Sequence, residues 1–508
     1  MGVKAFVAAL WAAILTTTTT PAFAQDVTLT SREGGIVLSG TLQGFDGEFY
    51  RVSTAYGMLT VDGQGVICEG PACPDLAAPR AVIRIVGDVG PAKALLPPLF
   101  QAFAENRGLV YQAQDGPPLA ARVLDPETGE ELAVISFMPL SPPFASAALE
   151  AGDADLKLSF QPDPAFLAHS VAMEPLVVIV APDNPTPRIS TVDLARILSG
   201  EIDNWSAIGG PDMPIVLHSL QPELDMQLAL NARLGTPVAA AVLHPDQESL
   251  AKAVALDPWA VGLTGSADIA PARRLPLADS CGFPLLPTAL AVKAEDYPLA
   301  LPVLLLAPKR RMPLMTREFL DFLRTPIAQG VIAASGYVDR AATRGPMTDD
   351  GLRLINAIKG AGEDITLADL KRLVGVMDGA DRLSLTFRFE DGTSTLDATS
   401  QDNLVDLAQL IASGQFRNER MVLAGFSDGS GTAEANLALS TERAAKVAQE
   451  LVAIAPDLPL ESLPVVEGFG EALPMACDET DIGRHLNRRV ELWLLPDFGM
   501  AEGANEQP

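Results

Sequence analysis

The chain contains few of the residues on which several classes of protein depend. Four histidines and four cysteines are spread over 508 residues, without a CxxC pair or an HExxH motif. We therefore expect no metal site and no cofactor. Basic residues are also scarce, because 36 Lys and Arg stand against 64 Asp and Glu, a formal net charge of -28. Phosphate backbones would be repelled, so nucleic acid is excluded as a general partner.

Long apolar runs are missing beyond the N-terminus. No later segment reaches the roughly 20 apolar residues of a membrane-spanning helix, so we expect no transmembrane segment in the mature chain. The N-terminus has Lys4, an apolar stretch over residues 5–15 and Ala22-Phe23-Ala24 before Gln25. This pattern predicts a secretory signal peptide over residues 1–24 and export of the mature protein.

Because exported proteins form disulfides, the four cysteines are candidates for disulfide bonds. Cys68 and Cys73 are five residues apart, a spacing that favours a local disulfide. Cys281 and Cys477 lie in different expected domains. We expect them to be two separate thiols, and the alternative is a disulfide that clamps two domains together.

The most informative stretch of the chain is residues 421–455. Its apolar start, Met421-Val422-Leu423-Ala424, predicts a strand, and a helical pattern follows from about residue 432. Between them, residues 425–431 contain three glycines and two serines, which favour a turn. Thr432 is a candidate N-cap. The sequence thus predicts a strand, a glycine-rich loop and a helix in succession.

Charged side chains occur on both the loop and the helix. Asp428 lies on the loop. One set of helix residues recurs at intervals of four, three and four, and so shares one face: Asn436, Ser440, Arg443 and Val447. This arrangement suits a small zwitterion, because Asp428 can hold an ammonium and Arg443 can bind a carboxylate through two parallel hydrogen bonds. The alternative is a structural salt bridge between Asp428 and Arg443.

Four motifs of this region resemble the OmpA C-terminal-like family in their order. They are Ser427-Asp428-x-x-Gly431, Asn436-x-x-Leu439-Ser440-x-x-Arg443-Ala444, Gly468-Phe469-Gly470-Glu471-x-x-Pro474 and Asn487-Arg488-Arg489-Val490-Glu491. That family binds the diaminopimelate side chain of peptidoglycan, and the resemblance implies that Asp428 and Arg443 do so here. Asn436, Asn487 and Arg488 match positions near the same site. Diaminopimelate ends in an ammonium and a carboxylate on one carbon, so both arguments name the same pair.

The run Gly425-Phe426-Ser427-Asp428-Gly429 also fits G-x-S-x-G, the nucleophile elbow of α/β-hydrolases. A hydrolase needs an acid and a histidine on later strands. Only one histidine, His485, follows Ser427. We therefore expect no catalytic residue and no enzyme activity, with a serine hydrolase as the alternative.

Residues 25–76 predict a small β domain. Short β-rich runs alternate with turn signals such as Gly34-Gly35 and Tyr56-Gly57. Four or five strands in so short a segment suit a small barrel, with a faint similarity to SH3-like or Sm-like barrels. Its aromatic residues are expected in the core: Phe45, Phe49, Tyr50 and Tyr56.

Residues 79–342 alternate between strands and helices, which predicts a parallel sheet covered on both faces. A helix over residues 91–106 is expected to be interrupted by Pro97-Pro98. Several motifs are similar to those of the phosphate-type periplasmic solute-binding family: Glu174-Pro175-Leu176-Val177-Val178, Ala181-Pro182-Asp183-Asn184-Pro185 and Ile197-x-x-Gly200-Glu201-Ile202-x-Asn204-Trp205. The resemblance implies two lobes with a ligand cleft between them.

The loops that would hold a ligand depart from that family. Phosphate binders use hydroxyls, backbone amides at helix starts and an arginine. Here Pro91 and Pro117 supply no amide proton, and Glu223 lies about where a cationic group belongs. We therefore expect a degenerate phosphate site. Its candidate solute-binding residues are Asp88, Val89, Gly90, Asp115, Gly116 and Ser219.

Apolar residues at helical spacing between residues 343 and 380 predict one or two packing helices. The fold class is multidomain α/β and α+β. The expected order is a signal peptide (1–24), a small barrel-like β domain (25–76), a two-lobed periplasmic solute-binding-like α/β domain (79–342), a helical connector (343–380), an OmpA-like βαβ domain (381–496) and a flexible tail (497–508).

These features together predict a non-catalytic protein of a Gram-negative cell envelope. We expect it to lie in the periplasm, attached to the cell wall near the outer membrane through peptidoglycan binding by its C-terminal domain. The central domain would display a cleft that could hold a small-molecule solute. The alternative is a working receptor for phosphate or another small anion, localised to the cell wall.

Overall fold

The computed structural model describes residues 27–496 except for a few short segments. The expected signal peptide and the C-terminal tail lie outside the described residues. The other segments left out are 33, 46–47, 71, 74–79, 115–118, 268, 311, 348–350, 361–364, 390–392 and 394. No helix within the described part of the chain is both long and apolar enough to cross a membrane.

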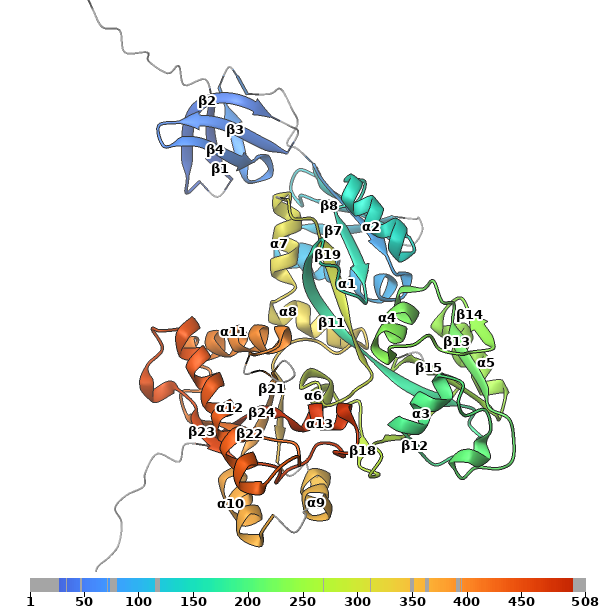
Figure 1. Cartoon of the computed structure of the whole chain (residues 1–508). Coiled ribbons are helices and arrows are strands. Elements are labelled where there is room, and N and C mark those ends of the chain that lie inside the picture. The colour runs from blue at the N-terminus through green and yellow to red at the C-terminus, as the bar shows by residue number, and fades with distance from the viewer. Residues whose placement is uncertain are drawn as a thin grey trace, which may run out of the picture.

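The N-terminal domain is a five-stranded antiparallel sheet, seen at the top of Figure 1. Its inward positions alternate along the strands and include Val27, Leu29 and Val52, which are buried. Cys68 and Cys73, the predicted pair, form a disulfide in this domain. The order is β4-β3-β2-β1-β5, with β1 (Val27–Ser31), β2 (Val37–Phe45), β3 (Phe49–Thr54), β4 (Gly57–Asp62) and β5 (Val66–Glu69).

The aromatic residues of this domain do not all lie in its core. Phe49 and Tyr50 are buried, as expected, but Tyr56 is 88% exposed. Tyr56 sits in the turn between β3 and β4, where its side chain has no facing sheet to pack against. The expectation of a core position was therefore wrong for Tyr56.

The central domain is built on a mixed sheet rather than the purely parallel one expected. β6 pairs in parallel with β9 and β10, and β13 pairs in parallel with β14 and β15, while the other neighbours are antiparallel. The strands are β6 (Ala81–Gly87), β7 (Val110–Gln114), β8 (Leu119–Leu124), β9 (Glu131–Pro139), β10 (Leu156–Ser159), β11 (Leu167–Val180), β13 (Val216–Leu220), β14 (Val242–His244), β15 (Ala260–Gly265) and β19 (Ala300–Ala307).

The long strand β11 joins the two lobes of this domain (Figure 1). Its first part pairs with β19, and its last part, from Leu176 onward, pairs with β15. We call the part that contains β6 to β10 the first lobe and the part that contains β13 to β15 the second lobe. The two lobes are therefore held together by continuous strands.

Helix α1 (Val89–Asn106) continues through Pro97 and Pro98, although we expected an interruption there. Each proline removes one backbone donor from the helix. Leu95, Leu96 and Leu99 of the same helix are fully buried, so tertiary packing offsets the lost hydrogen bonds.

The first lobe also contacts the N-terminal domain. Arg317 of helix α7 (Leu314–Phe322) donates from Nη2 to Asp62 at 3.1 Å, and the backbone N–H of Met315 donates to Gln64 at 3.2 Å. Asp62 is buried and Arg317 is partly exposed. These contacts attach the small sheet to the first lobe.

The connector contains the expected helices, α9 (Gly351–Gly360) and α10 (Leu367–Met377), and also a strand that we did not expect. That strand, β20 (Arg344–Pro346), pairs with the first strand of the C-terminal sheet. Ala357, Leu373 and Met377 pack with Val422 and Trp493 of that sheet. The connector is thus an integral layer of the C-terminal domain.

The C-terminal sheet has helices on both faces. Along its strand β22, Met421 and Leu423 face one core, which α11 and α12 cover, while Val422 and Ala424 face the other, which α9 and α10 cover. The sheet order is β20-β21-β24-β22-β23. The elements are β21 (Asp381–Phe387), α11 (Ala398–Ala412), β22 (Glu419–Phe426), α12 (Ala433–Ile454), β23 (Val465–Gly468), α13 (Asp481–Asn487) and β24 (Arg489–Pro496).

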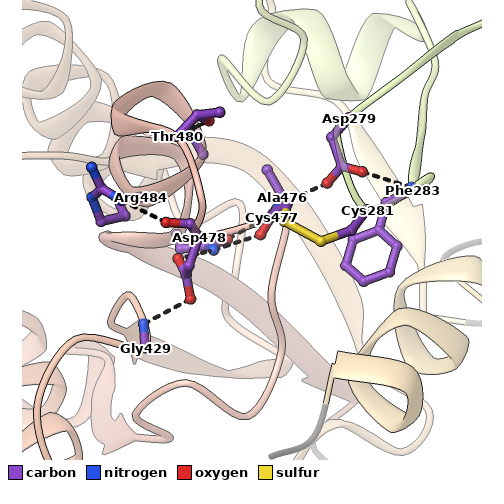
Figure 2. Close-up of a disulfide and its surroundings, with 11 residues drawn as sticks. Asp279, Cys281, Phe283, Gly429, Ala476, Cys477, Asp478, Thr480 and Arg484 are labelled. Atoms are coloured by element: carbon purple, nitrogen blue, oxygen red, sulfur yellow. Dashed lines mark hydrogen bonds between the residues drawn. A yellow bond between two sulfur atoms is a disulfide. The ribbon is translucent and has the colours of Figure 1, made fainter. Parts of the chain in front are cut away.

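The second lobe and the C-terminal domain are joined covalently. Cys281 and Cys477 form a disulfide, so the expectation of two separate thiols was wrong. The cysteines are 196 residues apart in the sequence, and no local pattern marks them as partners. Folding brings the turn after β17 (Leu277–Ala278) beside the segment before α13, as Figure 2 shows.

A buried cluster of charges reinforces this junction. Asp296, from the second lobe, forms ion pairs with Nη1 of Arg382 at 2.6 Å and with Nη2 of Arg388 at 3.0 Å. All three side chains are almost completely buried. Arg382 also lies 3.3 Å from Glu491 of β24, so the ionic cluster continues into the C-terminal domain.

Candidate functional site

The predicted strand, loop and helix are present, although the strand extends through Gly425 and Phe426, which we expected in the turn. β22 ends at Phe426, and the loop that follows leads to Thr432, whose side chain accepts a hydrogen bond from Ala435 N at the start of α12. Gly431 has a φ of +104°, a conformation that glycine adopts without strain. Glycine is also required at position 425, because a Cβ there would lie 2.0 Å from the carbonyl oxygen of Ser440. The strand and helix therefore pack closely, and their packing sets the direction of the loop.

The loop carboxylate of Asp428 pairs with Arg488. Nη1 of Arg488 donates to Oδ2 of Asp428 at 2.9 Å, and Oδ1 accepts a hydrogen bond from Ser430 N. The Asp428 side chain is 13% exposed and that of Arg488 is 25% exposed, so solvent and a ligand can reach the pair. Arg488 matched a family position near the site, but the sequence did not identify it as the partner of Asp428.

Arg443 lies on the inner side of α12 without pairing to Asp428. Its Nη1 is buried and has no hydrogen-bond partner, and its guanidinium carbon lies 5.8 Å from the ring centre of Phe389. Burial lowers the pKa of Arg443, the positive charge of Arg488 lowers it further, and Asp428 opposes this shift. The salt bridge proposed as the alternative from the sequence is therefore not the arrangement observed, and Arg443 keeps an unused buried donor.

Asn436 and Asn487 have structural partners. Nδ2 of Asn436 donates to Glu471 at 3.0 Å. Oδ1 of Asn487 accepts from the backbone N–H groups of Met475 and Ala476, and its Nδ2 donates to Ala476 O and Asp478. Both asparagines therefore support the walls of the site through these contacts.

Ser427 does not have the environment of a catalytic nucleophile. Its side chain is 3% exposed, and its hydroxyl is buried without a hydrogen-bond partner. A nucleophile elbow instead presents its serine at the surface of the sheet, within reach of a base. The geometry therefore gives no support to the hydrolase alternative.

The central domain contains a cleft of about 670 Å³ between its lobes. Asp88, Val89 and Gly90 line it, as expected. Ser219 does not belong to the lining residues, because it is buried in β13 and donates to Gln227 at 2.7 Å. Asp115 and Gly116 lie outside the described residues.

Aspartates lie at three of the four helix starts that line this cleft, and the fourth, that of α2 (Pro142–Ala151), begins after Ser141. Asp88 caps α1 by accepting from Gly90 N at 2.9 Å, and Asp246 caps α5 (Gln247–Leu256) by accepting from Ser249 N at 2.7 Å. Asp225 begins α4 (Asp225–Leu234), is almost fully buried and accepts from Phe160 N at 2.7 Å. Of these three aspartates, the sequence had pointed only to Asp88. The convergence of the three helices is visible only in the folded structure.

The electrostatics of the cleft follow from these side chains. Among the described residues that line it, five are acidic and one, Lys93, is basic. Burial raises the pKa of Asp88 to about 6, its hydrogen bond from Gly90 opposes the shift, and the charge of Asp225 adds to it. The described lining is therefore unfavourable for an additional anion.

Comparison with known proteins identifies the families that the central and C-terminal domains resemble. Residues 388–488 match the model of the OmpA family, and residues 144–325 match that of a PBP superfamily domain. The chain therefore has an OmpA family domain at its C-terminus and a PBP-like domain before it. Both are classes of non-catalytic binding domain.

Individual relatives are similar to one part of the chain each. Outer membrane porin F of Pseudomonas fluorescens is 34% identical over 112 residues, which are 22% of this chain and 32% of that protein. The phosphate-binding protein PstS of Bacillus subtilis is 25% identical over 189 residues, 36% of this chain and 59% of that protein. An ABC-type phosphate transport receptor from Vibrio cholerae aligns with 20% identity and a TM-score of 0.39, covering 50% of this chain and 99% of the receptor. The chain thus spans less than two thirds of either curated relative.

Proposed function

We propose that this protein binds peptidoglycan through the OmpA family domain and so attaches the PBP-like domain to the cell wall. The observation that carries the proposal is the unused, buried Nη1 donor of Arg443, next to the reachable pair of Asp428 and Arg488. A buried donor without a partner costs free energy in the unliganded protein, so a ligand acceptor would recover it.

The chemistry of this site matches the end of a diaminopimelate side chain. The ligand carboxylate would accept a hydrogen bond from the free Nη1 of Arg443, and the ligand ammonium would donate to Asp428. Arg488 already donates to Asp428. With Arg443, it would balance the negative charges of the Asp428 carboxylate and the ligand carboxylate when both lie in the site. Asn436 and Asn487 support the walls through the contacts described above.

The test is co-sedimentation of the full-length mature protein with purified sacculi. We expect saturable binding that a stem peptide containing meso-diaminopimelate inhibits. The matching lysine-containing peptide, whose side chain ends in an ammonium without a carboxylate, should inhibit far less. Equal inhibition by both peptides, or no pelleting with sacculi, would refute the proposal.

For the central cleft, we propose that the phosphate site is degenerate. Anion-binding sites of this kind offer backbone N–H groups at helix starts. Here Asp88 and Asp246 accept from those groups, and Asp225 places another carboxylate at a third helix start. The protein's own carboxylates thus take the place of a bound anion. The alternative, a working receptor for phosphate, requires these acids to be neutralised or displaced.

A further inference from the structure

The segment 475–480 lies between the PBP-like domain and the site of Asp428, and it is held from both sides (Figure 2). On the first side, Cys477 is bonded to Cys281 of the second lobe. The backbone N–H of Cys477 also donates to Oδ2 of Asp279 at 2.6 Å, while Oδ1 of Asp279 accepts from Phe283 N at 2.7 Å. The lobe therefore holds Cys477 by one covalent bond and one charge-assisted hydrogen bond.

On the second side, the next residue, Asp478, contacts both halves of the site. Its Oδ2 accepts from Gly429 N at 2.8 Å, and its Oδ1 accepts from Nδ2 of Asn487 at 2.8 Å. Gly429 directly follows Asp428, and Asn487 directly precedes Arg488. One carboxylate thus links the sequence neighbours of both members of the Asp428–Arg488 pair.

The close approach at Gly429 shows how tightly this contact is built. A Cβ at position 429 would lie 2.7 Å from Oδ2 of Asp478 and 3.2 Å from Oε2 of Glu471. The loop backbone therefore reaches the Asp478 carboxylate only because residue 429 has no side chain. A shift of Asp478 would move or release the backbone that carries Asp428.

We propose that Asp478 is a positioning residue for the peptidoglycan site, and that the Cys281–Cys477 disulfide together with Asp279 holds it in place. This inference rests on the proposed function of Asp428 and Arg443. Its consequence is that the affinity for peptidoglycan depends on a covalent bond to a different domain. Reduction of that bond lets segment 475–480 move, so the site of Asp428 is no longer held in its binding conformation. The ligand must then order the site on binding, which lowers the affinity.

The experiment uses the full-length mature protein, purified sacculi and dithiothreitol. The reagent transfers two electrons and two protons to the S–S bond, which yields two thiols, and is itself oxidised to a cyclic disulfide. We expect reduction to weaken sacculus binding about tenfold, the effect of losing roughly one charge-assisted hydrogen bond. Removal of the reagent and reoxidation by air should restore the affinity.

Two pairs of substitutions assign the effect to the correct disulfide. The variant Cys281→Ser/Cys477→Ser should bind weakly with or without dithiothreitol. The matched control, Cys68→Ser/Cys73→Ser, should respond to dithiothreitol as the wild type does. Hydrogen exchange at the amide of Gly429 should accelerate on reduction, while the amides of β22 stay protected.

Asp279→Asn and Asp478→Ala test the same connection with the disulfide intact, should the serine variant fail to fold. Each should weaken binding severalfold, with the larger loss at Asp478→Ala. If oxidised wild type binds sacculi but neither reduction nor these variants weaken binding, the inference is wrong and the proposed function stands. If oxidised wild type does not bind at all, the proposed function itself fails.

Discussion

Arg488 donates to Asp428 at 2.9 Å, and this pair forms without Arg443. The charge of the Asp428 carboxylate is therefore balanced by Arg488 in the unliganded protein. The neighbouring Nη1 of Arg443 is buried and has no hydrogen-bond partner. Of the three charged groups, Arg443 has the most to gain from a ligand carboxylate. Removal of Arg443 should therefore weaken ligand binding without lowering the stability of the unliganded protein.

The first prediction concerns Arg443→Met, which replaces the buried cation by an apolar side chain of similar length. The free energy of unfolding should stay the same or rise, because an unpaired buried donor is removed. Affinity for sacculi should fall by about thirtyfold or more, since loss of one member of a desolvated charge pair costs about 2–5 kcal/mol. Urea unfolding and sacculus co-sedimentation measure the two quantities.

Lys446→Met is the matched control on the same helix. Lys446 forms a partly exposed ion pair with Glu450 one turn along α12. Its removal should change unfolding and binding only slightly. Strong destabilisation by Arg443→Met with unchanged binding would instead identify Arg443 as a structural residue.

The second prediction concerns Ser427→Ala. The hydroxyl is buried without a partner, so its removal should leave sacculus binding within about twofold of wild type and should not reduce stability. A fluorophosphonate probe should label neither protein. Labelling of wild type that disappears in Ser427→Ala would revive the hydrolase alternative.

The third prediction concerns the pH dependence that Asp88 causes. Its pKa in the folded protein is raised to about 6, so the folded state binds a proton more tightly than the unfolded state does. The stability from this group is present below the unfolded pKa of about 4 and is lost as pH rises through about 6. Asp88→Asn keeps an oxygen that can cap α1. It should remove this pH dependence and stabilise the protein by about 1–3 kcal/mol at pH 7.

Unfolding midpoints of wild type and Asp88→Asn between pH 4 and pH 8 give the measurement. The two curves should approach each other at low pH and separate as pH rises. Parallel curves across this range would show that Asp88 does not titrate as its surroundings require.

The fourth prediction concerns phosphate. Calorimetry of the full-length protein should detect no orthophosphate binding in the low micromolar range, about -8 kcal/mol on the standard scale. Asp88→Ser/Asp246→Ser keeps hydroxyls that can cap both helices but removes two negative charges, so it should bind phosphate more tightly than wild type does. Tight binding by wild type, or no gain in the variant, would contradict the degenerate site.

The fifth prediction concerns Asp296, the buried acid at the junction of two domains. Asp296→Ala leaves Arg382 and Arg388 without this partner and should destabilise the protein by about 3–5 kcal/mol. Glu295→Ala is the control, because Glu295 is 36% exposed and lies 3.7 Å from Arg388. It should cost less than about 1 kcal/mol. Guanidinium unfolding provides the comparison, and equal effects of the two substitutions would contradict the role assigned to Asp296.

Local patterns predicted the elements of the site better than its contacts. The β22 strand, the loop and the Thr432 cap follow from apolar runs, glycines and capping chemistry, all of which act between near neighbours. The pairing of Asp428 with Arg488 joins residues 60 positions apart. It depends on how two elements meet in the folded sheet, which no spacing in the sequence encodes.

The junction between domains was only partly predictable for a similar reason. The Cys281–Cys477 disulfide was the alternative to two separate thiols, but no spacing signal favours it. Asp296 resembles any other acid in a chain with 64 acidic residues. The convergence of Asp88, Asp225 and Asp246 at one cleft also requires the folded arrangement of three helices. The sequence predicted the kinds of domain, whereas tertiary packing determines how they are joined.

The Cys281–Cys477 bond also determines how the protein would respond to mechanical load. With the proposed wall attachment at the C-terminal domain, a force applied to the N-terminal domain would pass through the whole chain. The disulfide bypasses 196 residues of chain, which fully extended would span roughly 650–700 Å. While the bond is intact, tension passes directly from the second lobe to the C-terminal domain. The chain between Cys281 and the proposed wall-binding loop of Asp428 is thereby shielded from stretching.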